Sequence, residues 1–369
     1  MHLARNLFVA KSLKQIPTRN GYGEGLVEAG KRDKNVVVLC CDLTESTRSE
    51  MFKKIFPNRF VQMGVAEQSL ASIGAGMAMA GKIPFISSYA TFSPGRNWEQ
   101  IRTTIALQNS NVKIAGAHSG LSVGPDGATH QMLEDIIITR AIPNMTVEVP
   151  CDAIETRKTT IAGAKYVGPF YFRFARANSP VFTTEKTPFK LGRAELFRFG
   201  NDLTIIAAGP LVYEALVAAE MLSKNHGIEA RVINCHSIKP IDEKTIVVAA
   251  KETGAIVTVE EGQVHGGLAG AICETLALTV PVPVERVGVQ DTFGESGEPR
   301  QVQEAFGVTA PFIALACDRV LQRKLENVVS KIPAHIQAAH EQRLLMRESV
   351  MNESLSRAPL KWGGKKTKG

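Results

Sequence analysis

Short apolar segments alternate with longer segments of helical periodicity along most of the chain. Ten β-branched or aromatic runs predict strands: 35–42, 59–65, 83–90, 112–117, 145–150 and 170–175 in the first half, then 203–209, 230–236, 255–261 and 285–290. Helical patterns lie between them, most clearly at 211–224, 241–252 and 268–278. Strands that alternate with helices in this way are typical of parallel sheets covered on both faces. The sequence therefore predicts an α/β fold class with two doubly wound domains.

The same pattern predicts the domain organisation. We expect a basic N-terminal arm at 1–14, a first domain at 15–180, a linker or hairpin at 181–202 and a second domain at 203–325. After these, residues 326–369 predict an extension that contains a polar helix at 334–350 and ends in a disordered Gly/Lys-rich tail.

The net charge of +7 would suggest a nucleic-acid partner, but its distribution does not. Residues 1–19 carry four basic and no acidic side chains, and residues 352–369 carry five basic and one acidic, which leaves a formal charge of −1 for the rest. A nucleic-acid groove needs basic and aromatic side chains clustered on the folded body. We therefore expect no nucleic-acid partner and interpret the two ends as solvated arms or partner contacts.

Neither membrane insertion nor secretion is predicted. No apolar run approaches the length of a membrane span, and the start lacks the apolar core of a secretory signal. The six cysteines show no CxxC spacing and lie mostly in apolar runs, which predicts reduced core thiols in a cytoplasmic protein.

One carboxylate stands at the start of an unusually small helix. From Glu67 to Gly81, nine of fifteen positions are Gly, Ala or Ser, so this helix is suited to close backbone contact. A carboxylate there could satisfy backbone donors at the helix N-terminus, or it could be buried with a partner. Burial among small apolar residues would raise its pKa and keep it protonated for chemistry.

A second segment rich in candidate chemistry follows the predicted strand 112–117. His118, Asp126 and His130 lie there among glycines that permit close backbone approach to a ligand. In open parallel sheets this carboxyl edge is the ligand-binding edge. Two imidazoles and a carboxylate can transfer protons and bind hydroxyl groups, which favours a hydroxyl-rich substrate. A metal site and a purely structural polar loop remain alternatives.

Dispersed polar residues could hold a phosphate group. Arg19 is expected just before the first helix, Ser46 after a strand end, and Arg176 after the last strand of the first half. Each alone is more often a surface residue. The glycine-containing turn 262–267 resembles an anion-binding helix start, although one such turn is a weak signal.

Taken in order, four motifs resemble transketolase, and more closely the pyrimidine-binding and C-terminal domains of the thiamine-diphosphate enzyme superfamily. The motifs are GVAEQ at 64–68, YATF at 89–92, AHSGLSVGPDGATHQ at 117–131 and FARANSP at 174–180, and the likeness covers roughly residues 15–320. The resemblance implies that Glu67 hydrogen-bonds N1′ of the thiamine diphosphate pyrimidine. It thereby promotes the imino tautomer that removes the proton from the thiazolium C2.

The resemblance also implies roles for the other residues. Phe92 would stack on the aminopyrimidine ring of the cofactor. Arg96 and Trp98, which lie in a loop whose length differs from that of ordinary transketolases, would be further neighbours of the cofactor. Asp42 would lie near both the cofactor and the substrate entrance. For the sugar, His118 would contact the terminal hydroxyl of the donor, Asp126 the configuration of the next hydroxyl, and His130 the nascent aldehyde. The sugar phosphate would be bound by Arg19, Ser46 and Arg176.

One family motif is missing. These enzymes hold the diphosphate through Mg²⁺ or Ca²⁺ with a G-D-G motif, which occurs nowhere in the 369 residues. We therefore expect no metal ligand in this chain. A partner subunit would supply the diphosphate and metal half, and a split transketolase with two copies of each subunit, a heterotetramer, would form the sites at the interface.

Three alternatives remain. The first is a 1-deoxyxylulose-5-phosphate synthase, which usually has an acid at the position of His118, so this histidine favours transketolase. The second is the beta chain of a 2-oxoacid dehydrogenase, which lacks the GPDGATHQ loop that this chain has in full. The third alternative, a non-catalytic assembly subunit, is disfavoured because Glu67, His118, Asp126, His130 and Arg176 are all present.

Overall fold

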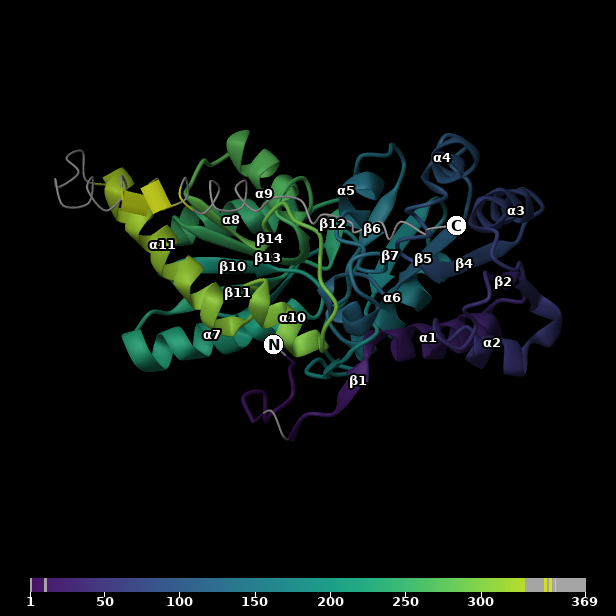
Figure 1. Cartoon of the computed structure of the whole chain (residues 1–369), viewed down its shortest axis with the longest axis horizontal. Coiled ribbons are helices and arrows are strands. Elements are labelled where there is room, and N and C mark those ends of the chain that lie inside the picture. Colours follow the sequence, from purple (N-terminus) through teal and green to yellow (C-terminus); the bar gives the residue numbers. More distant parts are fainter. Residues whose placement is uncertain (1, 10–11, 329–341, 344, 347–348, 350–369) are drawn as a thin grey trace, which may run out of the picture. The chain divides into compact units, whose positions relative to one another are not determined.

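Two open sheets flanked by helices make up the computed structural model, which describes residues 2–9, 12–328, 342–343, 345–346 and 349 (Figure 1). Both sheets belong to one compact unit, Met1–Leu321. All ten predicted strands are present, eight of them shorter than predicted and β13 (Ile256–Gln263) and β14 (Val284–Val289) with shifted ends, and the predicted α/β fold with two doubly wound sheets is confirmed. The predicted helix 334–350 and tail lie largely outside the described residues.

The first sheet has seven strands. Their order is β12 (Ser237–Lys239), β6 (Thr146–Glu148), β7 (Phe170–Phe174), β5 (Lys113–Ala117), β4 (Ile83–Tyr89), β2 (Val36–Cys40) and β3 (Phe60–Gln62). Every pairing is parallel except that of β12 with β6. The carboxyl ends of β2, β4, β5 and β7 therefore meet at one edge, where the predicted site loops begin.

Helices cover both faces of this sheet because successive strand residues point to opposite sides. Val38, Phe85 and Phe172 pack on one side beneath α1 (Thr18–Arg32), α2 (Glu50–Ile55) and α6 (Ala153–Lys165). Leu39 and Ile86 pack on the other side with α3 (Glu67–Met79) and the π-helix Ile101–Ala106. Figure 1 shows α3 and α1 on opposite sides of the strands. Shorter helices complete this half: α4 (Trp98–Gln100), α5 (Asp135–Arg140) and the 3₁₀ helices Pro57–Arg59 and Leu121–Asp126.

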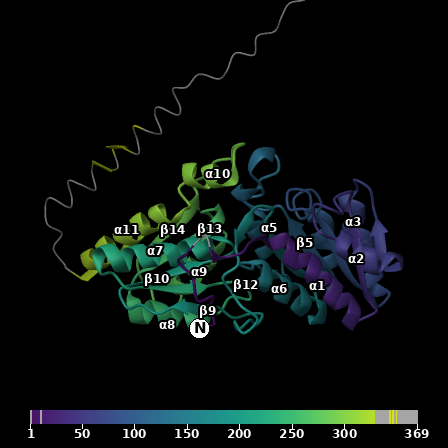
Figure 2. The same ribbon diagram turned by 90° about the horizontal axis from the view of Figure 1, so that it is seen from below.

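The second sheet has five strands. Their order is β14 (Val284–Val289), β13 (Ile256–Gln263), β10 (Leu203–Ala207), β11 (Ala230–Asn234) and β9 (Glu195–Arg198), and only β9 is antiparallel. The helices are α7 (Leu211–His226), α8 (Glu243–Thr253), α9 (Leu268–Ala277), α10 (Pro299–Ala305) and α11 (Ala310–Val328). Figures 1 and 2 show α7 and α8 on opposite sides of β10.

The structure corrects two expectations about the connections. Residues 195–198, expected in the linker, form β9 of the second sheet. The N-terminal arm is not a solvated arm over residues 2–9: Leu3, Ala4 and Leu7 pack against the core of the second sheet, and the Leu7 carbonyl accepts a 3.0 Å hydrogen bond from Tyr213. A two-stranded ribbon of β1 (Gln15–Pro17) and β8 (Asn178–Pro180) follows the arm.

All six cysteines are free thiols and five are buried, as predicted. Among the described residues, no helix is long and apolar enough to cross a bilayer.

Candidate functional site

Glu67 occupies the first turn of α3 and is 2% exposed. Its carboxylate accepts a 3.1 Å hydrogen bond from the Ser88 hydroxyl and forms a 2.9 Å ion pair with Arg96, which is 48% exposed. The amide of Asn97 donates to the Glu67 carbonyl at 2.9 Å. The carboxylate is therefore both at a helix N-terminus and buried with partners, two possibilities that the sequence left open: Ser88 on β4 and Arg96 in the loop after β4 contact it.

Aromatic rings and imidazoles gather beside that loop. Tyr89 stacks on His118 with 4.0 Å between ring centroids and 22° between planes. Phe92 meets His130 edge to face at 5.5 Å, and the Arg96 guanidinium lies 4.6 Å from the Phe92 centroid. The structure thus brings four of the predicted site residues together: Phe92, Arg96, His118 and His130. It adds Tyr89, whose position within YATF is the signal that could have indicated it.

His118 is kept neutral. It is 1% exposed, and burial together with the positive charges of Arg19 and Arg176 lowers its pKa to about 3. Its backbone has φ of +53°, and its Nδ1 is buried without a hydrogen-bond partner within the described residues. A buried ring nitrogen without a partner is costly to the fold, which marks this imidazole as a group placed to meet a ligand.

Three arginines concentrate positive charge near His118. Arg19 lies inside the first turn of α1, not before it as expected, and donates to the Ser46 carbonyl at 3.0 Å. Burial and the neighbouring cations Arg48 and Arg176 lower the pKa of Arg19. Arg176 pairs with Asp126 at 3.2 Å.

Arg48 is a member of this group that the sequence analysis missed. Its Nε donates to Asn20 at 2.9 Å, and it lies two residues after Ser46 in the loop that follows β2. Arg48 also pairs with Glu50 at 3.6 Å, as Arg176 does with Asp126. A cluster of three guanidinium groups is nevertheless suited to a phosphate or another anion.

Two predicted residues are less central. The Trp98 indole donates to the Ile138 carbonyl at 2.9 Å, and its ring packs against the core, so its observed role is to fix the loop after β4. Asp42 has an exposed side chain and φ of +49°, and it begins the loop that contains Ser46.

The turn 262–267 is not an anion site. The backbone N–H groups of Leu268 and Ala269, at the start of α9, both donate to the buried carboxylate of Glu260 at 2.9 Å. This side chain already supplies the negative charge that the helix start attracts. In the part of the chain that the structure describes, no group of three or more His, Cys, Asp or Glu side chains could hold a metal ion.

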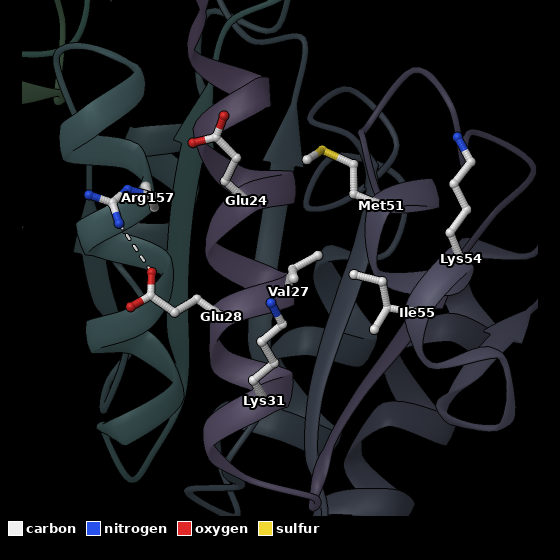
Figure 3. A pocket seen from close by; sticks show the side chains of 8 residues that line it. All are labelled: Glu24, Val27, Glu28, Lys31, Met51, Lys54, Ile55 and Arg157. Atoms are coloured by element: carbon white, nitrogen blue, oxygen red, sulfur yellow. Dashed lines mark hydrogen bonds and ion pairs between the residues drawn. The ribbon is translucent and has the colours of Figure 1, made fainter.

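A groove of about 620 Å³ lies elsewhere, between α1, α2 and α6 (Figure 3). Val27, Met51 and Ile55 line it, and the ion pair of Arg157 with Glu28 at 3.1 Å lies at one side. It contains none of the predicted site residues.

Comparison with known proteins defines the class. Residues 14–181 match the family model of the transketolase pyrimidine-binding domain, and residues 192–313 match that of the transketolase C-terminal domain. The chain belongs to the transketolase family.

Its relatives include proteins that are named as transketolase subunits. It is 40% identical to a 6-deoxy-6-sulfo-D-fructose transketolase subunit of Clostridium sp., over 83% of this chain and 95% of the relative. It is also 40% identical to an apulose-4-phosphate transketolase subunit of Phocaeicola vulgatus, over 79% of this chain and 94% of the relative. A solved structure described as a split gene transketolase, inactive beta4 tetramer, matches with a TM-score of 0.79 and 44% identity, over 84% of this chain and 99% of that one. The resemblance to the pyrimidine-binding subunit of a split transketolase is thus confirmed.

Membership of this family implies dependence on thiamine diphosphate. The residues present fit the aminopyrimidine half of that cofactor. They are a buried carboxylate at the start of α3, the half-buried ring of Phe92 after β4, and a buried imidazole after β5 whose Nδ1 has no partner within the described residues.

Proposed function

We propose that this chain is the subunit of a thiamine-diphosphate-dependent transketolase that transfers a two-carbon ketol unit from a ketose phosphate to an aldose phosphate. Xylulose 5-phosphate is the proposed donor, and ribose 5-phosphate or erythrose 4-phosphate the acceptor, as in the pentose phosphate pathway. One observation carries the proposal: a buried carboxylate, two imidazoles and three arginines lie on helix starts and loops that are near one another.

The cofactor supplies, when bound, a nucleophilic carbon that the side chains of a protein lack. In our proposal Glu67 holds a proton toward the pyrimidine N1′, and Phe92 stacks on that ring. Arg96 pairs with the same carboxylate and therefore must adjust when a ring nitrogen approaches. Asp42 and Trp98 remain proposed neighbours of the cofactor, Trp98 through its hold on the loop.

The proposed sugar roles follow from charge and position. Neutral His118 offers its free Nδ1 to a donor hydroxyl group, and His130, whose Nδ1 lies 2.9 Å from the Thr129 hydroxyl, exchanges a proton with the aldehyde oxygen. Asp126, held by Arg176, recognises the next hydroxyl group. Arg19, Arg176 and the polar groups of Ser46 bind the phosphate through charge-assisted hydrogen bonds.

We further propose that a partner subunit supplies the diphosphate-binding half with its Mg²⁺ or Ca²⁺, in a heterotetramer with two copies of each subunit. The absence of a G-D-G motif from these 369 residues supports this proposal, as do the two relatives at 40% identity that are named as transketolase subunits. A cytoplasmic location is also proposed, because the free buried thiols suit a reducing compartment.

Different substrates are the main competing proposals. Relatives at 40% identity are named for a sulfonated ketose and for apulose 4-phosphate. The three arginines favour a dianionic phosphate over a monoanionic sulfonate. A 1-deoxyxylulose-5-phosphate synthase-like or 2-oxoacid dehydrogenase-like activity is less consistent with a neutral, buried imidazole at residue 118.

The test is reconstitution. The tagged chain is used to capture its partner from the native lysate, the partner is identified by mass, and both subunits are purified and combined with thiamine diphosphate and Mg²⁺. Xylulose 5-phosphate with ribose 5-phosphate should give turnover that depends on both subunits, whereas pyruvate should not. Turnover with pyruvate alone would refute the transketolase assignment, and turnover by this chain without a partner would refute the split.

A further inference from the structure

The sugar loop, defined as residues 116–131, rests on the second sheet. Glu261 lies on β13 and is 5% exposed. Its Oε1 accepts a short hydrogen bond from the backbone N–H of Ser122, in the middle of the loop. Gln303 of α10 hydrogen-bonds the same carboxylate. A side chain from the second sheet thus binds the backbone of a loop that begins at the end of β5, in the first sheet.

Arg173 of β7 ties the two sheets together at this point. Its Nε donates to the Ser119 hydroxyl at 2.9 Å, and its guanidinium donates to the Glu261 carbonyl at 3.0 Å. It also pairs with buried Asp135 at 3.2 Å. Arg173 is itself buried, so these contacts hold the start of the loop at a site of low local dielectric, where hydrogen bonds are strong.

The loop packs closely against Glu261 at Gly120. Gly120 has φ of +83°, and a Cβ added to it would lie 2.8 Å from the Glu261 carboxyl carbon. The Gln131 amide, at the other end of the loop, donates to the Leu121 carbonyl at 3.2 Å and to the Glu295 carbonyl at 2.9 Å. The loop is therefore held by residues of the second half of the chain at Ser122, in its middle, and at Gln131, at its C-terminal end.

We propose that the second sheet positions the sugar loop through Glu261, so that this carboxylate is a positioning residue for His118 and His130. The inference rests on the proposed function and deepens it, because it assigns the C-terminal half a task in substrate binding. The loop carries the two imidazoles that contact Tyr89 and Phe92, and the Ser122 N–H that donates to Glu261 lies between them in the sequence. Without the Glu261 carboxylate, the buried N–H of Ser122 has no hydrogen-bond acceptor, and we expect the loop to move to an arrangement that satisfies this donor.

Two variants and one matched control test the proposal. Glu261→Ala removes the acceptor, and Glu261→Gln keeps a neutral acceptor of the same shape. Glu260→Gln is the control, because Glu260 is the neighbouring residue, equally buried, and caps α9 instead of the loop. Circular dichroism and thermal melts first establish that each variant is folded.

The first readout needs no activity. Hydrogen exchange of the chain alone should show amides of the sugar loop exchanging at least about tenfold faster in Glu261→Ala, less so in Glu261→Gln, and unchanged in Glu260→Gln. In the reconstituted complex, Glu261→Ala should raise the KM for the ketose phosphate by roughly tenfold or more and leave the cofactor KM unchanged. Glu261→Gln should recover most of that loss.

Unchanged exchange in Glu261→Ala would overturn the proposal, as would an equal change in Glu260→Gln. A wild-type complex without ketol transfer, together with the expected exchange difference, would refute the proposed function and still support the loop contact.

Discussion

Replacing Glu67 separates a catalytic carboxylate from a structural one. In Glu67→Ala, the Ser88 hydroxyl, which is fully buried, loses its acceptor, which costs about 1–3 kcal/mol. The Arg96 ion pair adds less than about 1 kcal/mol, because Arg96 is half exposed and can be hydrated. A domain with a stability of about 5–15 kcal/mol remains folded after that loss.

The expected loss of activity is much larger. If Glu67 holds the proton toward the cofactor, kcat should fall by roughly 10²–10⁴-fold in both Glu67→Ala and Glu67→Gln. The assay is ketol transfer by the reconstituted complex at saturating cofactor, with urea unfolding of the chain alone as the measure of stability.

Ser88→Ala is the matched control. It removes the same hydrogen bond but keeps the carboxylate, so it should lose about 1–2 kcal/mol of stability and less than about tenfold of kcat. The reasoning fails if Glu67→Gln retains activity within about tenfold of wild type, or if Ser88→Ala loses as much activity as Glu67→Ala.

Three further predictions concern charge. His118→Asn should lower kcat/KM by roughly tenfold. The shape of the pH profile between about pH 6 and about pH 9 should not change, because a pKa of about 3 keeps the imidazole neutral throughout that range. A break in the wild-type profile near pH 6.5 that disappears in the variant would contradict this. Arg19→Met should raise the KM for phosphorylated donors by about 10–100-fold and leave that for an unphosphorylated ketose nearly unchanged, and equal effects on both would exclude a phosphate contact. Burial lowers the pKa of Lys113 to about 7, so the unfolded chain binds more protons from about pH 7 to about pH 10 and this group adds stability as the pH rises. The stability difference between wild type and Lys113→Met in urea unfolding should therefore shift by about 2–3 kcal/mol in favour of wild type from pH 7 to about pH 9, and a constant difference would refute the shift.

The sequence predicted the long, fully buried strands well because their apolar runs have no other explanation. It missed β12, β1 and β8, which are three residues each, and placed the four residues of β9 in a linker. Such strands depend on the neighbour that pairs with them, and no local periodicity indicates them.

The candidate site was predicted as residues but not as contacts. The resemblance of three motifs to the transketolase family indicated Glu67, Phe92, His118 and His130. The position of the loop with the two histidines after a buried strand placed that loop at the ligand-binding edge of a sheet. The Glu67–Arg96 pair joins residues 29 positions apart, and the Glu261–Ser122 contact joins residues 139 positions apart. Such contacts follow from how the loops pack, which composition and spacing do not specify.

The strand β12 limits how this chain could have been assembled or could be rebuilt from parts. By sequence it belongs to the second half, yet it forms the edge of the first sheet, and the Ser237 hydroxyl lies 2.8 Å from both carboxylate oxygens of Glu148. A cut in the connection near residue 190 would leave β6 with an open hydrogen-bonding edge and a buried carboxylate without its partner. The two halves of the chain therefore cannot be exchanged independently of each other. A chimera of two related subunits should keep its function only when residues 237–239 come from the same parent as the first half, or when they are compatible with β6 of that parent.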